Sequence, residues 1–230
     1  FRDDLRTFDH PALRAAVDHA VTSQGSQESD DGASSEPAGV VALFVLDEES
    51  DGLRPLGGAV KWWLHHSLVA LRAKLEALGI PLVLRRGAAH DVVLDVVETF
   101  DVDFVGWNRR YGGPERVVDA GIKEALAERD VEVHSYAANL LFEPWTITTG
   151  GGTPYRVFTP FWKACLALPE PRKPLPAPTA ARGARPAVVL PDVPPRDPVG
   201  VGVARHMPKG LLLVPVGSFL GPVPRSAPVH

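Results

Sequence analysis

A polar loop follows one of the most apolar short runs in the chain. The run is Phe104–Trp107, and the residues directly after it are Asn108, Arg109, Arg110 and Tyr111. Such a run is typical of a strand buried on both faces of a parallel sheet, where ligands bind beyond the carboxyl ends of the strands. An amide both donates and accepts hydrogen bonds, and a guanidinium pairs with carboxylates. The loop therefore predicts a binding site for a small polar molecule.

Two charged residues near the start of the chain are expected at the same edge of the sheet. The sequence FRDDLR at 1–6 is typical of the end of a strand and the loop that follows it. Arg2 could pair with a ligand carboxylate or brace the strand end, whereas Asp4 fits better as a bracing ion-pair partner. Two roles stay open for Asn108: contact with a ligand ring, or a cap that closes an Asx turn in its own loop.

Residue spacing does not support other kinds of chemistry. His65 and His66 are adjacent on a predicted helix, where side chains point about 100° apart, so they are not spaced to share a metal ion. No G-x-S-x-G nucleophile motif occurs, and Cys165 in its aromatic setting is typical of a packed thiol. Gly150–Gly152 precedes no helix and indicates a turn rather than a phosphate loop. We predict no catalytic residue and no metal ligand.

The elements that must position the polar loop alternate between strands and helices. After the strand end at 1–6, strands are predicted at 40–46, 81–84, 104–107 and around 131–133, with helices at 13–20, 61–78, 91–100 and 115–129. Asp9 is expected to cap the first helix, with Pro11 in its first turn. This order predicts an α/β fold: a Rossmann-like, open, parallel, five-stranded sheet with helices on both faces.

The longest predicted helix has a regular apolar stripe. Five leucines repeat at alternating spacings of four and three, at positions 64, 68, 71, 75 and 78. This spacing places them on one face, and Gly79 suits the left-handed residue that often ends a helix. The stripe predicts the face that covers the sheet.

The chain divides into three segments by composition. Residues 1–140 hold the strand and helix pattern of one domain, with a flexible surface insertion expected at 23–39. Residues 141–178 form an aromatic linker segment, expected to anchor against something apolar. Residues 179–230 form a Pro- and Gly-rich tail, expected to be poorly ordered or aberrant. Of the 23 prolines, 15 lie after Leu168, which is too many for a helical domain.

Charge and composition limit the partners of the chain. A net charge of -4 gives no electrostatic reason for this chain to bind nucleic acid by itself, and a single cysteine suits a reducing compartment. No apolar run reaches the roughly 18 residues of a membrane span. The first residue is Phe1 and no charged leader precedes an apolar segment, so we expect no signal peptide and a chain that lacks its true start. We expect a monomeric protein of bacterial, cytoplasmic type with no membrane partner.

Five sequence blocks occur in an order that matches a known protein family. They are FRDDLR at 1–6, GGAVKWWLHHSL at 57–68, WNRRY at 107–111, NLLFEPW at 139–145 and YRVFTPFWKAC at 155–165. Together they resemble the N-terminal α/β domain of the DNA photolyase and cryptochrome family, over about residues 1–178. The family's larger C-terminal helical domain has no counterpart in this sequence.

The resemblance implies the antenna-chromophore domain of a light-driven deoxyribodipyrimidine photolyase, a DNA-repair enzyme. In this family the domain binds a chromophore, methenyltetrahydrofolate or 8-hydroxy-deazaflavin, which passes excitation to FAD. FAD and DNA belong to the C-terminal domain, so the present chain is expected to be inactive alone. Two alternatives stay open: a cryptochrome-like blue-light photoreceptor, and a stand-alone nucleotide-binding α/β protein. The second lacks a Gly-rich phosphate loop after a strand.

The resemblance also implies which residues contact the chromophore. The expected cofactor-binding residues are Arg2, Asn108, Arg109, Tyr111 and Glu115. Folate-binding relatives often have a carboxylate after the tyrosine, where this chain has Gly112-Gly113. Glu115 is the candidate substitute, and the choice between the two chromophores stays open.

Overall fold

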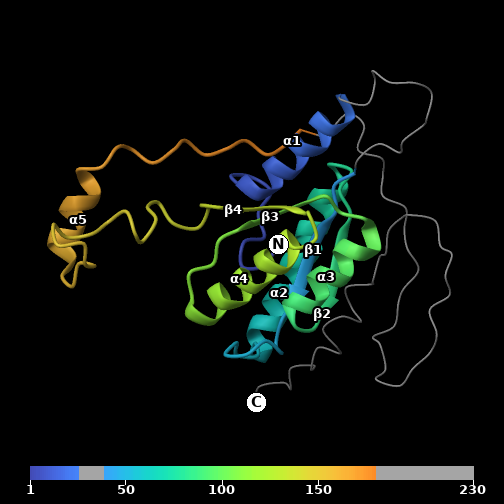
Figure 1. Cartoon of the computed structure of the whole chain (residues 1–230), viewed down its shortest axis with the longest axis horizontal. Helices are drawn as coiled ribbons and strands as arrows, with labels where there is room; N and C mark the ends of the chain where they lie inside the picture. The colour runs from blue at the N-terminus through green and yellow to red at the C-terminus, as the bar shows by residue number, and fades with distance from the viewer. Residues whose placement is uncertain (26–38, 180–230) are drawn as a thin grey trace, which may run out of the picture.

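Strands and helices alternate along the computed structural model, which describes residues 1–25 and 39–179 (Figure 1). The elements are α1 (Pro11–Gly25), β1 (Ala42–Leu46), α2 (Gly58–Glu76), β2 (Leu82–Arg86), α3 (Ala89–Phe100), β3 (Phe104–Asn108), α4 (Gly113–Ala127), β4 (Glu132–Tyr136) and α5 (Phe158–Leu166). The predicted α/β class is confirmed. Most of the predicted insertion, 26–38, and nearly all of the predicted tail, 180–230, lie outside the described residues.

The strands pair in parallel, but as two separate sheets. β1 pairs with β2, with Ala42 opposite Leu82, and β3 pairs with β4, with Phe104 opposite Glu132. The prediction of one five-stranded sheet is not confirmed. Residues 1–6 form no strand, because the Phe1 amine donates a single bond, at 2.7 Å, to the carbonyl of Leu43. One bond does not join the facing edges of β1 and β3.

Helices cover both faces of the strands. Side chains of a strand point alternately to opposite faces. On β1, Phe44 and Leu46 pack with residues of α1 and α2, whereas Val45 packs with residues of α3 and α4. The chain thus builds two apolar layers, one on each side, as expected for parallel strands buried on both faces.

The leucine stripe of α2 lies in the first of these layers. Leu68, Leu71 and Leu75 are at most 1% exposed, and Leu64 is also buried. Gly79 beyond the helix has a φ of 75°, in the left-handed region that glycine adopts without steric cost. Both predictions for this helix are confirmed: the buried face and the residue that follows its end.

Helix α1 is capped by a residue other than the predicted one. The His10 Nδ1 accepts a hydrogen bond from the Leu13 backbone N–H at 3.0 Å. Asp9 has a φ of 49°, whereas an N-cap normally has an extended backbone. Its carboxylate accepts instead from the Leu175 N–H at 3.0 Å and pairs with Arg172. The prediction of Asp9 as the cap is therefore wrong, because Asp9 holds a distant segment.

The segment after β4 leaves the sheet and returns to it. In Figure 1 helix α5 stands apart from the strands, and the orange chain after it runs back toward α1. The Leu175 carbonyl accepts from the Asp9 N–H at 2.9 Å. Phe158 and Trp162 on α5 stack with their ring centroids 6.3 Å apart and are 70% and 47% exposed. Cys165 at the end of the block is buried, but these two rings are not, so the expected apolar anchor stays a prediction.

Within residues 1–25 and 39–179, no helix is both long and apolar enough to cross a bilayer.

Stability should fall on acidification because His10 is buried. Burial lowers the pKa of His10 to about 4, from 6.5, so the ring is neutral in the fold and protonates mainly when the chain unfolds. Stability is then full above about pH 6.5 and decreases as the pH falls toward 4. We expect a loss of about 2 kcal/mol between pH 7 and pH 5. Denaturant unfolding at both pH values measures it.

The matched variant is His10→Asn, which keeps an acceptor for the helix cap and does not titrate. Its stability should change less between pH 7 and pH 5 than that of the unmodified chain. The Phe1 amine, whose pKa burial lowers to about 5, adds a dependence of the same sign in both proteins. Equal changes in the two proteins would contradict the role given to His10.

Candidate functional site

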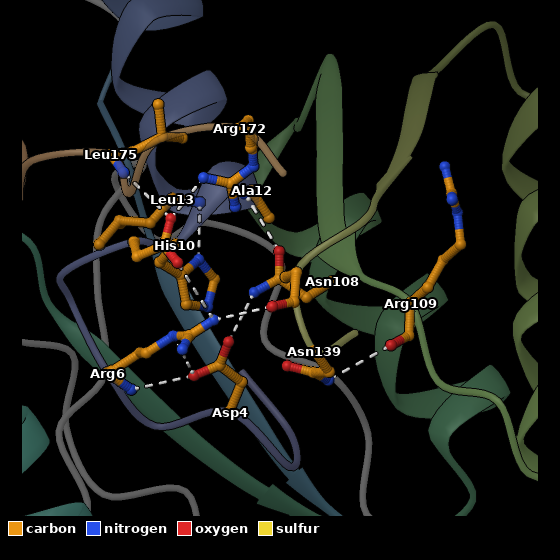
Figure 2. A network of polar contacts seen from close by, with 12 residues as sticks. Asp4, Arg6, His10, Ala12, Leu13, Asn108, Arg109, Asn139, Arg172 and Leu175 are labelled. Carbon is orange, nitrogen blue, oxygen red and sulfur yellow. Dashed lines mark hydrogen bonds and ion pairs between the residues drawn. The ribbon is translucent and has the colours of Figure 1, made fainter. Parts of the chain in front are cut away.

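The carboxyl ends of β3 and β4 carry the polar residues that the sequence singled out. Asn108 is the last residue of β3, and Tyr136 is the last residue of β4. The Arg109 N–H donates to the Tyr136 carbonyl at 2.9 Å, so the ladder runs one step into the loop. Asn139 then donates to the Arg109 carbonyl at 3.4 Å (Figure 2). The loops beyond the two strands are therefore held together.

Asn108 joins three segments that are far apart in the sequence. Its Nδ2 donates to Asp4 Oδ2 at 3.0 Å, and its Oδ1 accepts from the Ala12 backbone N–H at 3.3 Å (Figure 2). The side chain is buried, with 9% of the residue exposed. Of the two roles left open, this geometry supports a cap, although Asn108 caps α1 rather than its own loop. Asp4 also pairs with Arg6 at 3.2 Å and has the predicted bracing role.

A buried carboxylate joins the N-terminal loop to α4. Asp119 on α4 pairs with Arg2 through both carboxylate oxygens, with Arg2 Nη2 to Oδ2 at 3.0 Å. The same carboxylate pairs with Arg110 at 2.8 Å. The Arg2 guanidinium carbon lies 5.6 Å from the centroid of the Trp107 ring, within cation–π range. Arg2 is therefore committed to Asp119 and Trp107 in this structure.

Arg109 lies on the other side of the loop and holds the segment after β4. Its Nη2 donates to the Ser135 carbonyl at 2.8 Å, and its Nη1 pairs with Glu143. Its guanidinium carbon lies 5.7 Å from the centroid of the Trp145 ring. A second indole is thereby positioned near the end of β3.

These groups surround a cavity of about 280 Å³. The side chains that line it are two indoles, a phenol and several charged or small residues: Trp107, Arg109, Arg110, Tyr111, Arg116, Asp119, Ala120, Lys123, Ser135 and Trp145. Arg109 pairs with Glu143, and Arg110 shares the Asp119 carboxylate with Arg2. Arg116 and Lys123 have no ion-pair partner within 1–25 and 39–179. The cavity therefore keeps an excess of positive charge between aromatic walls.

Tyr111 contributes a phenol that the protein does not satisfy. Its hydroxyl has no hydrogen-bond partner among the described residues. Burial and the negative charge of Glu143 raise the pKa of Tyr111. The hydroxyl oxygen is itself buried, close to the Glu143 carboxylate and the Arg109 guanidinium.

The structure brings only part of the predicted site to this cavity. Arg109 and Tyr111 line it, whereas Arg2 and Asn108 line a neighbouring cavity between β1 and β3. Glu115 lines neither. Its carboxyl group folds back over Gly112, so that a Cβ built there would lie 2.7 Å from Glu115 Cδ.

Sequence reasoning missed the two unneutralised cations of α4. Arg116 and Lys123 are seven residues apart, with Asp119 between them, and this spacing repeats one face of a helix. That pattern, directly after the WNRRY block, could have identified them.

A metal centre finds no support in the described part of the chain: no three His, Cys, Asp or Glu side chains there are placed to hold an ion.

Comparison with known proteins gives concordant matches. The family model described as DNA photolyase matches residues 1–179. The chain is 40% identical over 174 residues to a deoxyribodipyrimidine photo-lyase of Agrobacterium fabrum, covering 76% of this chain and 32% of that protein. It is 34% identical over 177 residues to Cryptochrome-1 of Arabidopsis thaliana, covering 76% of this chain and 23% of that protein. The chain thus spans between about a quarter and a third of these relatives.

Solved structures agree with the sequence matches. A bacterial class III photolyase from Agrobacterium tumefaciens superposes with a TM-score of 0.65 at 38% identity, over 79% of this chain and 34% of that one. An archaeal photolyase from Sulfolobus tokodaii, described with two FAD molecules, gives 0.59 at 23% identity, over 78% of this chain and 36% of that one. The second likeness shows the fold alone.

Removal of the Asp119 carboxylate should strongly destabilise the fold. Asp119→Asn leaves two mostly buried guanidinium groups, those of Arg2 and Arg110, without a counter-charge. Breaking a buried ion pair on one side typically costs about 3 kcal/mol or more. The control is Asp18→Asn, which removes an exposed pair with Arg14 and should cost less than about 1 kcal/mol. Denaturant unfolding measures both losses. Similar losses in the two variants would show that the Asp119 ion pairs stabilise the fold no more than an exposed ion pair does.

Loss of the Asn108 amide should also lower stability, independently of any ligand. Asn108→Ala removes the donor to Asp4 Oδ2 and the acceptor for the Ala12 N–H, at a cost of about 1–3 kcal/mol. Asn108→Asp keeps the acceptor for Ala12 but places a second carboxylate against Asp4. It should therefore lose less stability at pH 4 than at pH 7. A melting temperature unchanged by Asn108→Ala would contradict the capping role.

Proposed function

The chain belongs to the DNA photolyase family, and we propose that residues 1–140 form an antenna domain that binds its chromophore in the 280 Å³ cavity beside β3. The observation that carries the proposal is the combination of two indoles and two unneutralised cations in the lining of one cavity. A planar heteroaromatic ring stacks on indole faces, and its polar atoms need donors. When bound, such a group supplies light absorption and the transfer of excitation to a flavin.

The charges of the cavity favour a folate, with its glutamate carboxylates, over a deazaflavin ring that has none. Arg116 and Lys123 lie on the face of α4 that lines the cavity, and their charge is available to a ligand carboxylate. Methenyltetrahydrofolate carries such carboxylates on its glutamate, at a distance from its pterin ring. We propose that the ring lies between the indoles and that the glutamate extends toward α4. The cavity volume lies just below the usual range for ligand pockets, about 300–1,000 Å³, so part of the ligand remains outside.

The other predicted residues do not line this cavity directly, but they position groups at its border. Arg2 lies over Trp107 and orients that indole, and Asn108 anchors the end of β3 to α1. Glu115 places a carboxyl group in the space where a side chain at position 112 would begin. We propose that Glu115 thereby substitutes for the carboxylate that folate-binding relatives often carry directly after the tyrosine.

The activity of the longer relatives extends this proposal. We propose that the domain serves a deoxyribodipyrimidine photolyase, in which FAD and damaged DNA are bound by regions that this chain does not match. The greater identity to a photolyase, 40% against 34% to a cryptochrome, favours repair over photoreception. The chain by itself is expected to bind chromophore but to repair no DNA.

Chromophore titration tests the proposal. We expect methenyltetrahydrofolate to bind the chain, with an affinity that falls as salt rises because exposed charges are screened. Arg116→Ala and Lys123→Ala should each weaken folate binding about three- to tenfold, the loss of one partly exposed charge contact. Arg129→Ala is the control, because Arg129 lies just after α4, outside the cavity, and donates to the Ala125 carbonyl.

8-Hydroxy-deazaflavin, whose ring system carries no carboxylate, serves as the second ligand. If it binds more tightly than folate and is indifferent to Arg116→Ala and Lys123→Ala, the chromophore is a deazaflavin and the assignment of folate is wrong. If neither compound binds, or if Trp145→Ala leaves both affinities unchanged, the cavity is not the antenna site.

A further inference from the structure

The turn after β4 carries the second indole of the cavity. Glu143, Pro144, Trp145 and Thr146 form a reverse turn, in which the Thr146 N–H donates to the Glu143 carbonyl at 2.9 Å. The Thr146 hydroxyl donates to the same carbonyl at 2.8 Å. Proline is favoured at the second position of such a turn, because its ring fixes φ near the value required there. The turn therefore gives Trp145 a defined backbone position outside the helices and strands.

The indole itself is only partly held by its surroundings. Trp145 lines the cavity, yet 60% of the residue is exposed. An exposed side chain that rotates freely must be fixed when a ligand stacks on it, and this loss of freedom weakens binding. An effective stacking surface therefore requires contacts that hold the turn and the ring before a ligand arrives.

Arg109 supplies such contacts on the side of the sheet. Its Nη2 donates to the Ser135 carbonyl at 2.8 Å, and its Nε donates to the Ser135 hydroxyl at 3.3 Å. Ser135 belongs to β4, so the guanidinium is fixed relative to the strands. Figure 2 shows the Arg109 side chain pointing away from the network around Asn108. The guanidinium carbon lies 5.7 Å from the centroid of the Trp145 ring, within cation–π range.

Glu143 connects this guanidinium to the turn. Its carboxylate pairs with Arg109 Nη1, and its side chain is only 14% exposed. Its Oε2 atom is buried near the Tyr111 hydroxyl. A partly buried ion pair is screened by salt much less than an exposed one. Glu143 is therefore both the first residue of the turn and the group that fastens the turn to β4 through Arg109.

Glu143 does not line the cavity, although three residues near it do: Arg109, Tyr111 and Trp145. Any effect of Glu143 on a bound ring must therefore act through these neighbours. Two effects of opposite sign follow from its position. The carboxylate holds the indole in place, which strengthens stacking, and it cancels the charge of Arg109, which weakens the attraction of an anionic ligand.

We propose that Glu143 is a positioning residue of the antenna cavity, and that its main role is to hold the Trp145 indole, through Arg109 and the turn, as the wall on which the chromophore ring stacks. Stacking on this ring rests on the proposed function, whereas the placement of the indole is a property of the chain alone. Within the block NLLFEPW at 139–145, the glutamate and the tryptophan then act as one unit.

Indole NMR tests the placement without any ligand. The cross-peak of the Trp145 indole N–H is assigned by its absence in Trp145→Phe. Glu143→Gln keeps the size of the side chain and removes its charge. We expect the order parameter of the Trp145 N–H to fall in this variant, because a neutral hydrogen bond is weaker than a charge-assisted one.

Two references accompany this measurement. The Trp107 indole belongs to β3 and lies beneath the Arg2 guanidinium, so its order parameter should stay the same in Glu143→Gln. The matched control is Glu128→Gln, which removes an exposed carboxylate just after α4 and should leave both indoles unchanged.

Chromophore titration tests the consequence for binding. Glu143→Gln should weaken methenyltetrahydrofolate binding about fivefold through loss of the stacking wall, even though it frees the positive charge of Arg109. In a Trp145→Ala background the same substitution should no longer weaken binding, because the two residues act as one unit.

Three results would overturn the role of Glu143. The first is an unchanged Trp145 order parameter in Glu143→Gln, whether or not a chromophore binds. The second is unchanged or tighter folate binding in Glu143→Gln, the result expected if the carboxylate merely cancels the charge of Arg109. The third is an equal weakening with and without the Trp145 indole. If no form binds a chromophore, the proposed antenna function fails, and the order parameter alone decides whether Glu143 positions the indole.

Discussion

The pairing of two guanidinium groups with the Asp119 carboxylate is the interaction on which the carboxyl edge of the sheet depends. Arg2 comes from the N-terminal loop, Arg110 from the loop after β3, and Asp119 from α4. Their burial makes the pairing obligatory, because an isolated charge out of water is costly. The Asn108 amide adds a second, uncharged connection from β3 to α1. The site therefore rests on a frame that is assembled before any ligand binds.

At the same edge of the sheet, some cationic side chains are paired with carboxylates and others are not. Arg109 and Arg110 are each paired with a carboxylate, whereas Arg116 and Lys123 line the cavity without an ion-pair partner among the described residues. The committed cations orient the two indoles and the loop, and the available ones give the cavity its net positive character. A ligand with a planar ring and a distant carboxylate satisfies both features. Our proposal of a folate as the ligand rests on this division of roles.

The middle of the domain shows what backbone hydrogen bonds require. β1 and β3 each have a fully paired edge and an edge turned toward the cavity between them. Between β1 and β3 there is no ladder, and the two halves are held together mainly by side chains packed against the helices on both faces. The single bond from Phe1 to Leu43 marks the point where the chain enters this space. Apolar side chains are thus packed on both faces of the strands, whereas no ladder of backbone hydrogen bonds joins β1 to β3.

The sequence by itself determined the α/β class, the buried leucine face of α2 and the position of the polar loop after β3, because each depends on short-range periodicity. Asp9 looked like a helix cap locally, yet its carboxylate holds Arg172 and Leu175, more than 160 residues away. For Arg2 and Asn108 the sequence left a ligand contact and a structural role open, and the fold shows internal partners for both, Asp119 for Arg2 and Asp4 and Ala12 for Asn108. It also predicted five strands in one sheet, although residues 1–6 supply a single ladder bond. Only the tertiary structure decided these points, since which side chain meets which partner depends on segments that the chain brings together across long distances.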